Sequence, residues 1–518
     1  MDGPAAGLTT GRGDDGTTRT GTRAGHLMRG CRMTGGHAVE QRDGSRGARS
    51  HDRQAPAVVA EVFRQGWADT GLRLPPVSGA ASAAKRRAAV SERFPGERIV
   101  VPAGGLRTRS NDFDYAFRPH SAFIHLIAEQ GTSAVPDSVL LFEPAGSGHE
   151  VTLFTRPRSP RDAGPSGAEF YSDRQHGEFW VGRRRTLRET ADALGVEAAA
   201  RDGLERALGG GVPTRVVRGT DAFVDALVPP SAPADAELLS FLSELRLVKD
   251  AWEIEQLRAA VGHTVAGFRD VVGELPRATR LARGERWVEG TFNRRAPLEG
   301  YGLGFETIAA AGAHACVLHW MHNDGPVREG ELLLLDAGVE ADSFYTGDVT
   351  RTLPVGGRFT DVQRRVYDLV FAAQSAGIAA LRPGAPYGAF HDAATRVIAE
   401  GLDAWGLRPG GGAIPHEPDL YRRYTVCGTG HMLGLDCHDC AAARSGTYPG
   451  GVLEEGHVLT VEPGLYFQPD DLTLPEELRG IGVRIEDDFV ITAEGALCLS
   501  SDLPRGADGI EAWMDASR

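Results

Sequence analysis

The sequence has little of several features that mark whole classes of protein. Its 518 residues include only six cysteines, too few for a disulfide framework in a chain of this length. No apolar run approaches the roughly 20 residues that a membrane-spanning helix needs. The N-terminus also lacks the apolar core of a secretion signal. We therefore expect a reduced, cytoplasmic protein that does not enter a membrane.

Positive charge is also in short supply. The 56 Lys and Arg residues are outnumbered by 70 Asp and Glu residues, so the net charge is −14. This balance argues against bulk electrostatic binding to nucleic acid or to an anionic membrane. The contents of 41% hydrophobic and 24% charged residues are those of a globular protein. Because the chain is too long for one ordinary core, we expect two domains with tails.

Residues 1–55 contain almost no large apolar side chains, so we predict a disordered tail there. Residues 56–245 alternate short apolar runs with helical stretches between turn residues, which predicts an N-terminal α/β domain. The expected strands are "RIVVPAG" (98–104), "SVLLFEP" (138–144) and "HEVTLFTRP" (149–157), and the expected helices cover 185–195 and 200–208.

A second domain is expected over residues 246–505, with 506–518 as a C-terminal tail. Apolar residues at three- and four-residue steps from Ile254 to Val272 predict an amphipathic helix within 243–272. Thr360 and Gln363 stand at capping-box spacing at the start of another helix. The predicted fold class is α+β. The further elements expected are strands at 305–312, 331–339, 457–462 and 483–492, and helices at 361–381 and 387–405.

In this second domain, ionisable side chains interrupt apolar or Gly-rich runs. An isolated charge among apolar groups is costly, so such residues are usually paired or bound to a metal ion. A hairpin with polar residues at its rim would explain two aspartates alone, but not the whole set. Its members are Asp336 and Asp348 in 332–352, His431 in "CGTGHMLGLDCHD" (427–439), Glu462 in "GHVLTVEPGLYF" (456–467) and Glu486 in "GVRIEDDFVI" (482–491).

Four carboxylates and one imidazole together carry a charge of −4, which two divalent cations would balance. Mostly oxygen donors with a single imidazole favour Mn²⁺ or a similar ion over a thiolate-type zinc site. The residues therefore predict a centre of two divalent ions, most simply Mn²⁺.

The order Asp, Asp, His, Glu, Glu resembles the dinuclear "pita-bread" metallopeptidases, and these motifs look most like aminopeptidase P, the Xaa-Pro aminopeptidase. The resemblance covers roughly residues 88–500. It implies an N-terminal domain followed by a pita-bread catalytic domain. It rests on "DAGVEADSFYTGDVTRTLPV", "GTGHMLGLDCHD", "LTVEPGLY" and "GVRIEDD", with weaker support from "TRSNDFDYAFRPHSAF", "EFWVGRR" and "LRLVKDAWEIEQLRAA".

By that resemblance, Asp336 and Glu486 each contact a metal bidentately or as a bridge, Asp348 bridges, and His431 and Glu462 complete one metal. Three further positions match the family's site in the same way. His319 and His438 would line it and contact substrate, and Arg484 would hold a ligand carboxylate. On the residues alone, His319 could equally be a core histidine and Arg484 a surface arginine. His322 matches no role and is expected at the rim.

Cys427 departs from the family, much of which has histidine four residues before the metal-binding histidine. We expect Cys427 to face the site and contact substrate, and to leave a working but slow enzyme. An extra metal ligand and an inert packing residue are the alternatives. The stretch "AFIHLIAEQG" (122–131) also departs from the family, which puts domain packing in question. The C-x-x-C of Cys437 and Cys440 is interpreted as incidental.

The implied activity is release of the first residue from Xaa-Pro-Yaa peptides. Two ions would activate water and polarise the carbonyl, His438 would stabilise the oxyanion, and Glu462 would move a proton to the leaving nitrogen. The alternatives are a prolidase limited to Xaa-Pro dipeptides, a metal-free binding protein of the same fold, and lastly a creatinase-like amidinohydrolase. A homodimer or homotetramer is expected.

Overall fold

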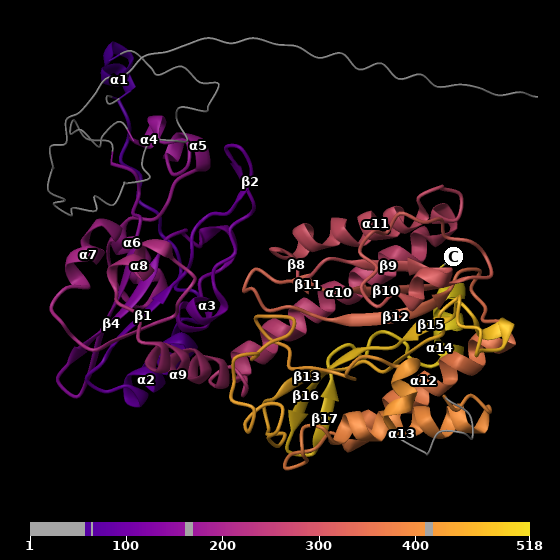
Figure 1. Cartoon of the computed structure of the whole chain (residues 1–518). Coiled ribbons are helices and arrows are strands. Elements are labelled where there is room, and N and C mark those ends of the chain that lie inside the picture. Colours follow the sequence, from indigo (N-terminus) through magenta and orange to yellow (C-terminus); the bar gives the residue numbers. More distant parts are fainter. Residues whose placement is uncertain (1–56, 64–65, 161–168, 410–417, 518) are drawn as a thin grey trace, which may run out of the picture. The chain divides into compact units, whose positions relative to one another are not determined.

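The structure is a computed structural model that describes residues 57–63, 66–160, 169–409 and 418–517. The predicted tail of residues 1–55 lies outside the described residues. The described chain contains an N-terminal α/β part followed by a larger part in which several small sheets pack against long helices, in keeping with the predicted α+β class (Figure 1). In the part of the chain described, no helix has both the length and the apolar character that a bilayer crossing requires.

The N-terminal part is built on a five-stranded mixed sheet in the order β6-β5-β4-β1-β7. The three strands predicted from the sequence correspond to β1, β4 and β5. Strand β4 pairs antiparallel with β1 and β5, whereas β7 and β6 add in parallel at the two edges. The strands are β1 (Arg98–Pro102), β4 (Val139–Ala145), β5 (Gly148–Thr155), β6 (Glu197–Ala200) and β7 (Thr214–Val216); β2 (Thr108–Ser110) and β3 (Phe113–Asp114) form a separate hairpin.

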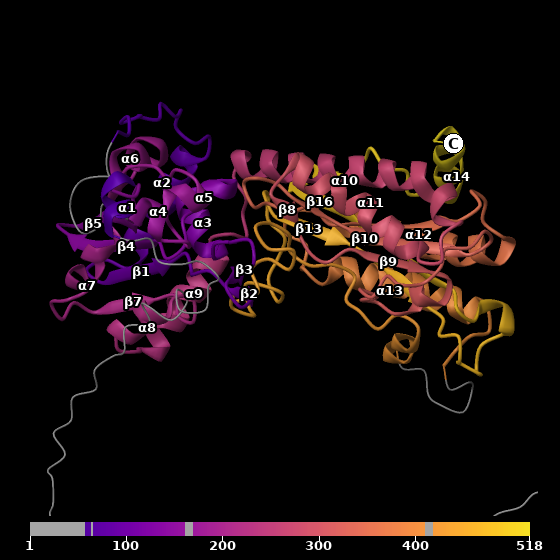
Figure 2. The same ribbon diagram turned by 90° about the horizontal axis from the view of Figure 1, so that it is seen from above.

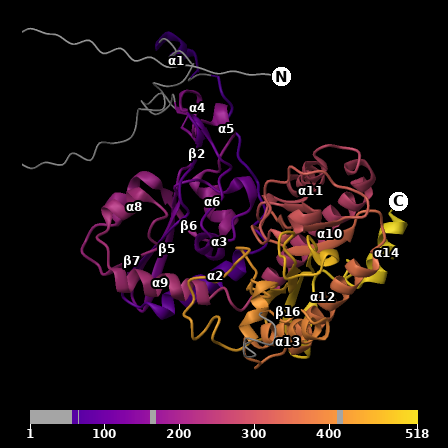
Figure 3. The ribbon, with the colours of Figure 1, turned by 45° about the vertical axis from the view of Figure 1, so that its right-hand side comes forward.

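Alternation along β1 decides which helices cover each face of this sheet. Ile99 and Val101 share a core with residues of α2 and α3, whereas Val100 lies in a second core with Val224 of α8. Figure 2 and Figure 3 show the helices around these strands. The helices are α1 (Ala57–Phe63), α2 (Ala80–Arg93), α3 (Ser121–Ile127), α4 (Glu169–Ser172), α5 (Glu178–Val181), α6 (Leu187–Leu194), α7 (Leu204–Ala207), α8 (Ala222–Leu227) and α9 (Ala232–Glu244).

The second part places strand β10 at the centre of an antiparallel β12-β10-β9 sheet, and β16 at the centre of a β13-β16-β17 sheet. Helix α11 contacts β9, and α12 contacts β13 (Figure 1). The strands are β8 (Gly302–Leu303), β9 (Ile308–Ala311), β10 (Leu332–Ala337), β11 (Val339–Glu340), β12 (Val349–Pro354), β13 (Val458–Val461), β14 (Gly464–Tyr466), β15 (Gly482–Arg484), β16 (Asp487–Thr492) and β17 (Gly495–Cys498).

The helices of this part are α10 (Ala251–Ala278), α11 (Gly284–Glu299), α12 (Asp361–Ala380), α13 (Ala389–Ala404) and α14 (Ala507–Ala516). The capping box predicted for α12 is present: the Thr360 side chain accepts from the Gln363 amide, and Gln363 returns a contact to the Thr360 amide. The helix predicted within 243–272 starts later. Asp250 caps α10 through a capping box with Glu253, because its side chain satisfies a free amide of the first turn.

The C-terminal segment corrects a prediction. Residues 506–518 were expected to be a tail, but Ala507–Ala516 form helix α14. Ile510 and Met514 are buried in the main core, and Glu511 accepts hydrogen bonds from Arg358 and from the Phe359 amide. The apolar residues recur at a helical step, so the segment buries enough surface to dock.

A buried ionic cluster ties α2 to the start of α10. Arg86 lies 2.7 Å from an Asp250 oxygen and 3.1 Å from a Glu253 oxygen. Glu253 also accepts from Tyr345 at 2.6 Å and lies 3.3 Å from His125. Burial alone would raise the pKa of Glu253, but contacts with His125, Arg86 and Tyr345 outweigh it and lower that pKa to about 2.

We predict that Glu253→Ala lowers the free energy of unfolding by about 3–5 kcal/mol, because it leaves the buried Arg86 without one of its two carboxylates. Urea unfolding measures the loss. The control is Glu255→Ala on the same helix, where the side chain is exposed. There, a change within about 0.5 kcal/mol is expected.

The same group predicts a pH dependence. Between a pKa of about 2 when folded and an ordinary value near 4.5 when unfolded, the unfolded chain binds more protons at Glu253. Stability should therefore fall as pH is lowered through this window. The fall should be shallower in Glu253→Ala, and identical slopes in both proteins would contradict the assignment.

Candidate active site

The register between β10 and β12 brings the two aspartates to one face. Asp336 is paired directly with Thr350, so their side chains lie on the same side of the sheet. Asp348 lies two residues before Thr350, and alternation along an extended chain gives it the same side. Asp336 and Asp348 are both buried. The hairpin therefore presents two carboxylates, with the Thr350 hydroxyl between them.

A second backbone pairing brings His431 and Glu462 together. The Thr460 amide donates to the His431 carbonyl at 2.9 Å, and the Glu462 amide donates to the Thr429 carbonyl at 2.9 Å. The His431 Nε2 atom lies 3.3 Å from Glu462 Oε1 and 3.4 Å from Asp348 Oδ2. The imidazole thus sits between a carboxylate from each of the two pairings.

Glu486 joins the cluster from the turn between β15 and β16. Its amide donates to the Thr350 carbonyl, and its Oε2 accepts from the Thr350 hydroxyl at 2.7 Å. One donor atom each from Asp348, His431 and Glu486 lies within 4.8 Å of the others. The structure therefore brings together the five residues singled out as metal ligands in the sequence.

Arg484 is a cation fixed inside this cluster. Its guanidinium donates to Asp336 Oδ2 at 2.6 Å, to the Thr350 hydroxyl at 3.2 Å and to the Tyr466 hydroxyl at 3.0 Å. Burial would lower its pKa, but the neighbouring groups outweigh it and raise the pKa well above the usual value. Arg484 is therefore a buried, paired arginine. The alternative, in which it is a surface residue of the strand, is wrong.

One arginine and one histidine do not compensate four carboxylates. Burial raises the pKa of Glu462 to about 7 and that of Asp336 above its ordinary value. Burial also raises the pKa of Glu486 well above the usual range, with Asp348, Glu462 and Asp336 adding repulsion. The Asp336 Oδ1 atom is buried without a hydrogen-bond partner. These donors fit divalent cations, which would supply the missing charge and bind the unpaired oxygen.

His438 and His319 lie on the open side of the cluster. The rings of His431 and His438 have their centroids 4.3 Å apart. Burial lowers the pKa of His438, and the nearby His431 and His319 lower it further. Both His438 and His319 are exposed, as groups that meet a substrate would be. His322 is exposed at the edge and contacts Trp320.

A buried glutamate on α11 holds the loop that carries His319. Glu285 is fully buried and accepts hydrogen bonds from the Ala311 and Gly325 amides, at the two ends of this loop. It also contacts the His314 ring and accepts from the Trp320 indole. Glu285 was missed in the sequence because a helical glutamate carries no signal of its own.

Cys427 faces the cluster from its half-buried position. Burial raises the pKa of its thiol, and the negative charge of Glu462 adds to that effect. Among the described residues, Cys427 is not part of either three-residue group close enough to hold one ion. The geometry favours a residue that lines the site over an extra metal ligand.

Cys437, the first cysteine of the C-x-x-C, contacts the cluster. Its Sγ donates to Asp348 Oδ2 at 3.0 Å, and burial together with the Asp348 charge raises the pKa of the thiol. Cys440 points elsewhere, into an apolar core, and both cysteines are free thiols. The motif is neither a disulfide nor a joint metal pair, but one of its members touches a proposed ligand.

The loop that carries Cys437 and His438 is anchored at two acidic residues. Asp439 is fully buried and pairs with Arg246 at 3.0 Å and with Lys249 at 3.2 Å. Asp436 accepts from the Ser121 hydroxyl and lies 3.6 Å from Arg118, which also pairs with Glu340 at 2.6 Å and donates to the Leu435 carbonyl. Segments far apart in the sequence thus fix the position of His438.

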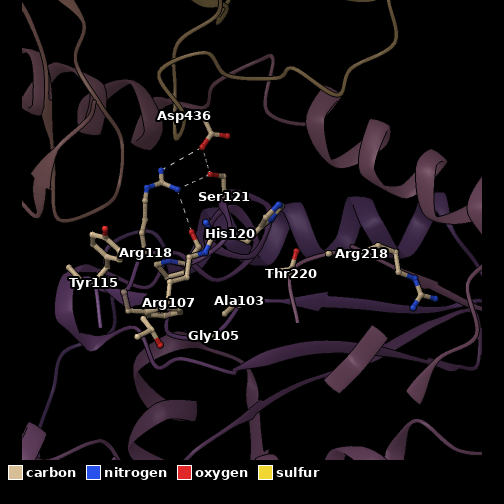
Figure 4. Close-up of a pocket in the computed structure, with 16 residues that line it drawn as sticks. Ala103, Gly105, Arg107, Tyr115, Arg118, His120, Ser121, Arg218, Thr220 and Asp436 are labelled. Carbon is tan, nitrogen blue, oxygen red and sulfur yellow. Dashed lines mark hydrogen bonds and ion pairs between the residues drawn. The ribbon is translucent and has the colours of Figure 1, made fainter. Parts of the chain in front are cut away.

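Figure 4 shows this second anchor in the wall of a pocket of about 800 Å³. Most of the wall comes from three segments of the N-terminal part. Asp436 is the lining residue from the loop that carries Cys437 and His438. None of the five proposed metal ligands lines it. The pocket therefore lies beside the cluster and does not contain it. The two are connected through the contact between Arg118 and Asp436.

The comparisons with known proteins agree with this geometry. The domain family described as "Metallopeptidase family M24" matches residues 255–493, and "Aminopeptidase P, N-terminal domain" matches residues 83–209. A Streptomyces coelicolor protein named Xaa-Pro aminopeptidase 1 is 54% identical over 465 residues, which cover 88% of this chain and 92% of the relative.

More distant relatives show the same likeness. The Escherichia coli Xaa-Pro aminopeptidase is 31% identical over 456 residues, covering 84% of this chain and 97% of the relative. A solved structure of aminopeptidase P from E. coli, in a low-pH form, superposes with a TM-score of 0.72 at 29% identity and covers 85% of this chain and 99% of that one.

Another solved structure is zinc-substituted E. coli aminopeptidase P in complex with product, with a TM-score of 0.72 at 29% identity and coverage of 87% of this chain and 100% of that one. Both domains, their order and the acidic cluster with its histidine lead to one conclusion. This chain belongs to the aminopeptidase P (Xaa-Pro aminopeptidase) family of M24 metallopeptidases.

Proposed function

We propose that Asp336, Asp348, His431, Glu462 and Glu486 hold two divalent cations, and that Mn²⁺ is the ion that suits this set. The family implies divalent metal ions. The observation that carries the proposal is one cluster that contains three buried carboxylates, the half-buried Glu462 and a single imidazole, with too little fixed positive charge to balance the carboxylates. Oxygen-rich donors with a single imidazole suit Mn²⁺.

When bound, the ions would activate water and polarise the peptide carbonyl. Arg484 keeps Asp336 oriented through the 2.6 Å contact, and Thr350 does the same for Glu486. His438 donates a hydrogen bond to the oxyanion that forms at the carbonyl. Glu462 takes the proton that the attacking water releases and passes it to the leaving proline nitrogen. His319 and Cys427 line the substrate's path.

The substrates are peptides with proline in the second position, from which the enzyme releases the first residue. This agrees with the name of the 54%-identical relative. An Xaa-Pro bond is a tertiary amide without an N–H group. Peptidases that bind their substrate through that N–H group cannot cleave an Xaa-Pro bond. Cleavage therefore requires a dedicated site with room for the proline ring.

Three alternative functions of the same fold differ from this proposal in their substrates or in their metal ligands. A prolidase would use the same ions on Xaa-Pro dipeptides alone. A binding protein would have lost ligands, whereas all five candidates lie together here. A creatinase-like amidinohydrolase would not need the full set. The cytoplasmic location, the homo-oligomeric state and the domain limits at 56–245 and 246–505 stay predictions, with the second domain extended to include α14.

The substrate assignment predicts cleavage of Xaa-Pro-Yaa with release of Xaa, and little or no cleavage of Xaa-Ala-Yaa. Liquid chromatography of a peptide panel with Mn²⁺, Co²⁺ or Zn²⁺ measures this. Equal rates on both tripeptides would refute proline specificity. Hydrolysis of the Xaa-Pro dipeptide alone would identify a prolidase.

The metal assignment predicts that Asp348→Asn loses bound metal and activity together, because one carboxylate can no longer contribute charge to the cluster. Losses of at least 10–100-fold in metal affinity are expected, as even outer contacts have effects of that size. Elemental analysis of the purified protein measures the metal content. The exposed Asp361, in the first turn of α12, supplies the control: Asp361→Asn should keep metal and rate. Full activity in Asp348→Asn would disprove the assignment.

A further inference from the structure

A thiol lies at the edge of the proposed oxygen-rich site, in contact with one of its carboxylates. Cys437 Sγ is 3.0 Å from Asp348 Oδ2, and the same oxygen is 3.4 Å from His431 Nε2. The thiol and the imidazole thus approach one carboxylate oxygen together. The mechanism above gives this thiol no task, and the dinuclear set is complete without it.

A third donor completes a different set around the same imidazole. One donor atom each from His431, Cys437 and His438 lies within 4.8 Å of the other two. A point therefore exists within about 2.8 Å of all three atoms, compared with roughly 2.0–2.3 Å for zinc–nitrogen and zinc–sulfur bonds. Each donor atom would have to move by up to about 0.5–0.8 Å to reach these bond lengths. The exposed His438 ring has room for such a shift.

The chemistry of this set differs from that of the carboxylates beside it. One sulfur and two imidazole nitrogens suit soft or borderline ions such as Zn²⁺ and Cd²⁺, and they leave a fourth position open. Hard ions such as Mn²⁺ prefer carboxylate oxygens and gain little from sulfur. Two donor sets of opposite preference therefore share the His431 imidazole.

We propose that His431, Cys437 and His438 form a thiophilic cation site that competes with the oxygen-rich site for His431. A soft ion held there withdraws His431 from the carboxylate set and His438 from the substrate, so it inhibits hydrolysis. Binding of the ion does not depend on the proposed function, whereas the inhibition does. Cys437 therefore makes hydrolysis sensitive to inhibition by soft ions in excess.

The direct test is a titration of the full-length protein with Cd²⁺, followed by ultraviolet absorption. A bound thiolate gives a charge-transfer band, which reports the sulfur–metal bond without any need for hydrolysis. The band should appear in the wild type and be lost in Cys437→Ser, a variant that keeps a hydrogen-bond donor next to Asp348. The matched control is Cys427→Ser, the other half-buried thiol that faces the cluster, and it should keep the band.

A second variant keeps the test independent of the folding of the first. His438→Gln should weaken Cd²⁺ binding at least tenfold, because one of three protein ligands is lost. Thermal melting checks that each variant is folded. A band that persists in Cys437→Ser, or that disappears in Cys427→Ser, overturns the proposal, as does unchanged Cd²⁺ affinity in His438→Gln.

The functional consequence is measured on the Mn²⁺-loaded enzyme. Cd²⁺ added to an Xaa-Pro-Yaa assay should inhibit Cys437→Ser at concentrations at least tenfold higher than the wild type, each relative to its own rate without Cd²⁺. Equal inhibition of both overturns the proposed competition. A wild type that shows the band but hydrolyses no Xaa-Pro-Yaa refutes the proposed function and leaves the cation site standing.

Discussion

The catalytic part depends on one unfavourable arrangement: three buried carboxylates and the half-buried Glu462 lie around a single imidazole. Each carboxylate would be costly alone, and burial together with repulsion from the neighbouring carboxylates raises the pKa of Glu486 well above its usual range. Three separate backbone pairings still bring them together, and one arginine, Arg484, is fixed against Asp336. A chain that builds such a cluster and pairs so little of it internally is built to receive cations.

The surrounding contacts explain how the cluster keeps its shape before any ion arrives. Thr350 lies at the centre: it is opposite Asp336 in the sheet, it donates to Glu486, and it accepts from Arg484. Asp488 accepts from the Asp348 amide at 3.0 Å and so fixes the turn that carries that aspartate. These contacts connect the carboxylates to β10, to β12 and to the turns beside the strands, so the fold itself positions them.

Most of the candidate site could be predicted from the sequence because the proposed ligands interrupt apolar runs. Asp336, Glu462 and Glu486 stand out against neighbouring leucines, valines and isoleucines, and their order matched a known family. Glu285 and Cys437 could not be found in that way, since their importance comes from loops that fold back on them. Helix α14 was missed for a related reason: ten residues bury little surface alone, and only the finished core gives Ile510 and Met514 a place to pack.

The two anchors of the His438 loop have a consequence for how the chain can be divided. Arg246 and Lys249 hold Asp439, and Arg118 holds Asp436, yet all three cations precede residue 255, where the match to the metallopeptidase family begins. A fragment cut at that boundary would keep all five proposed ligands. It would also leave two acids, one of them fully buried, without their partners beside His438. The loop beside His438 therefore depends on residues outside the segment that contains the ligands: on Arg246 and Lys249 just before α10, and on Arg118 of the N-terminal part.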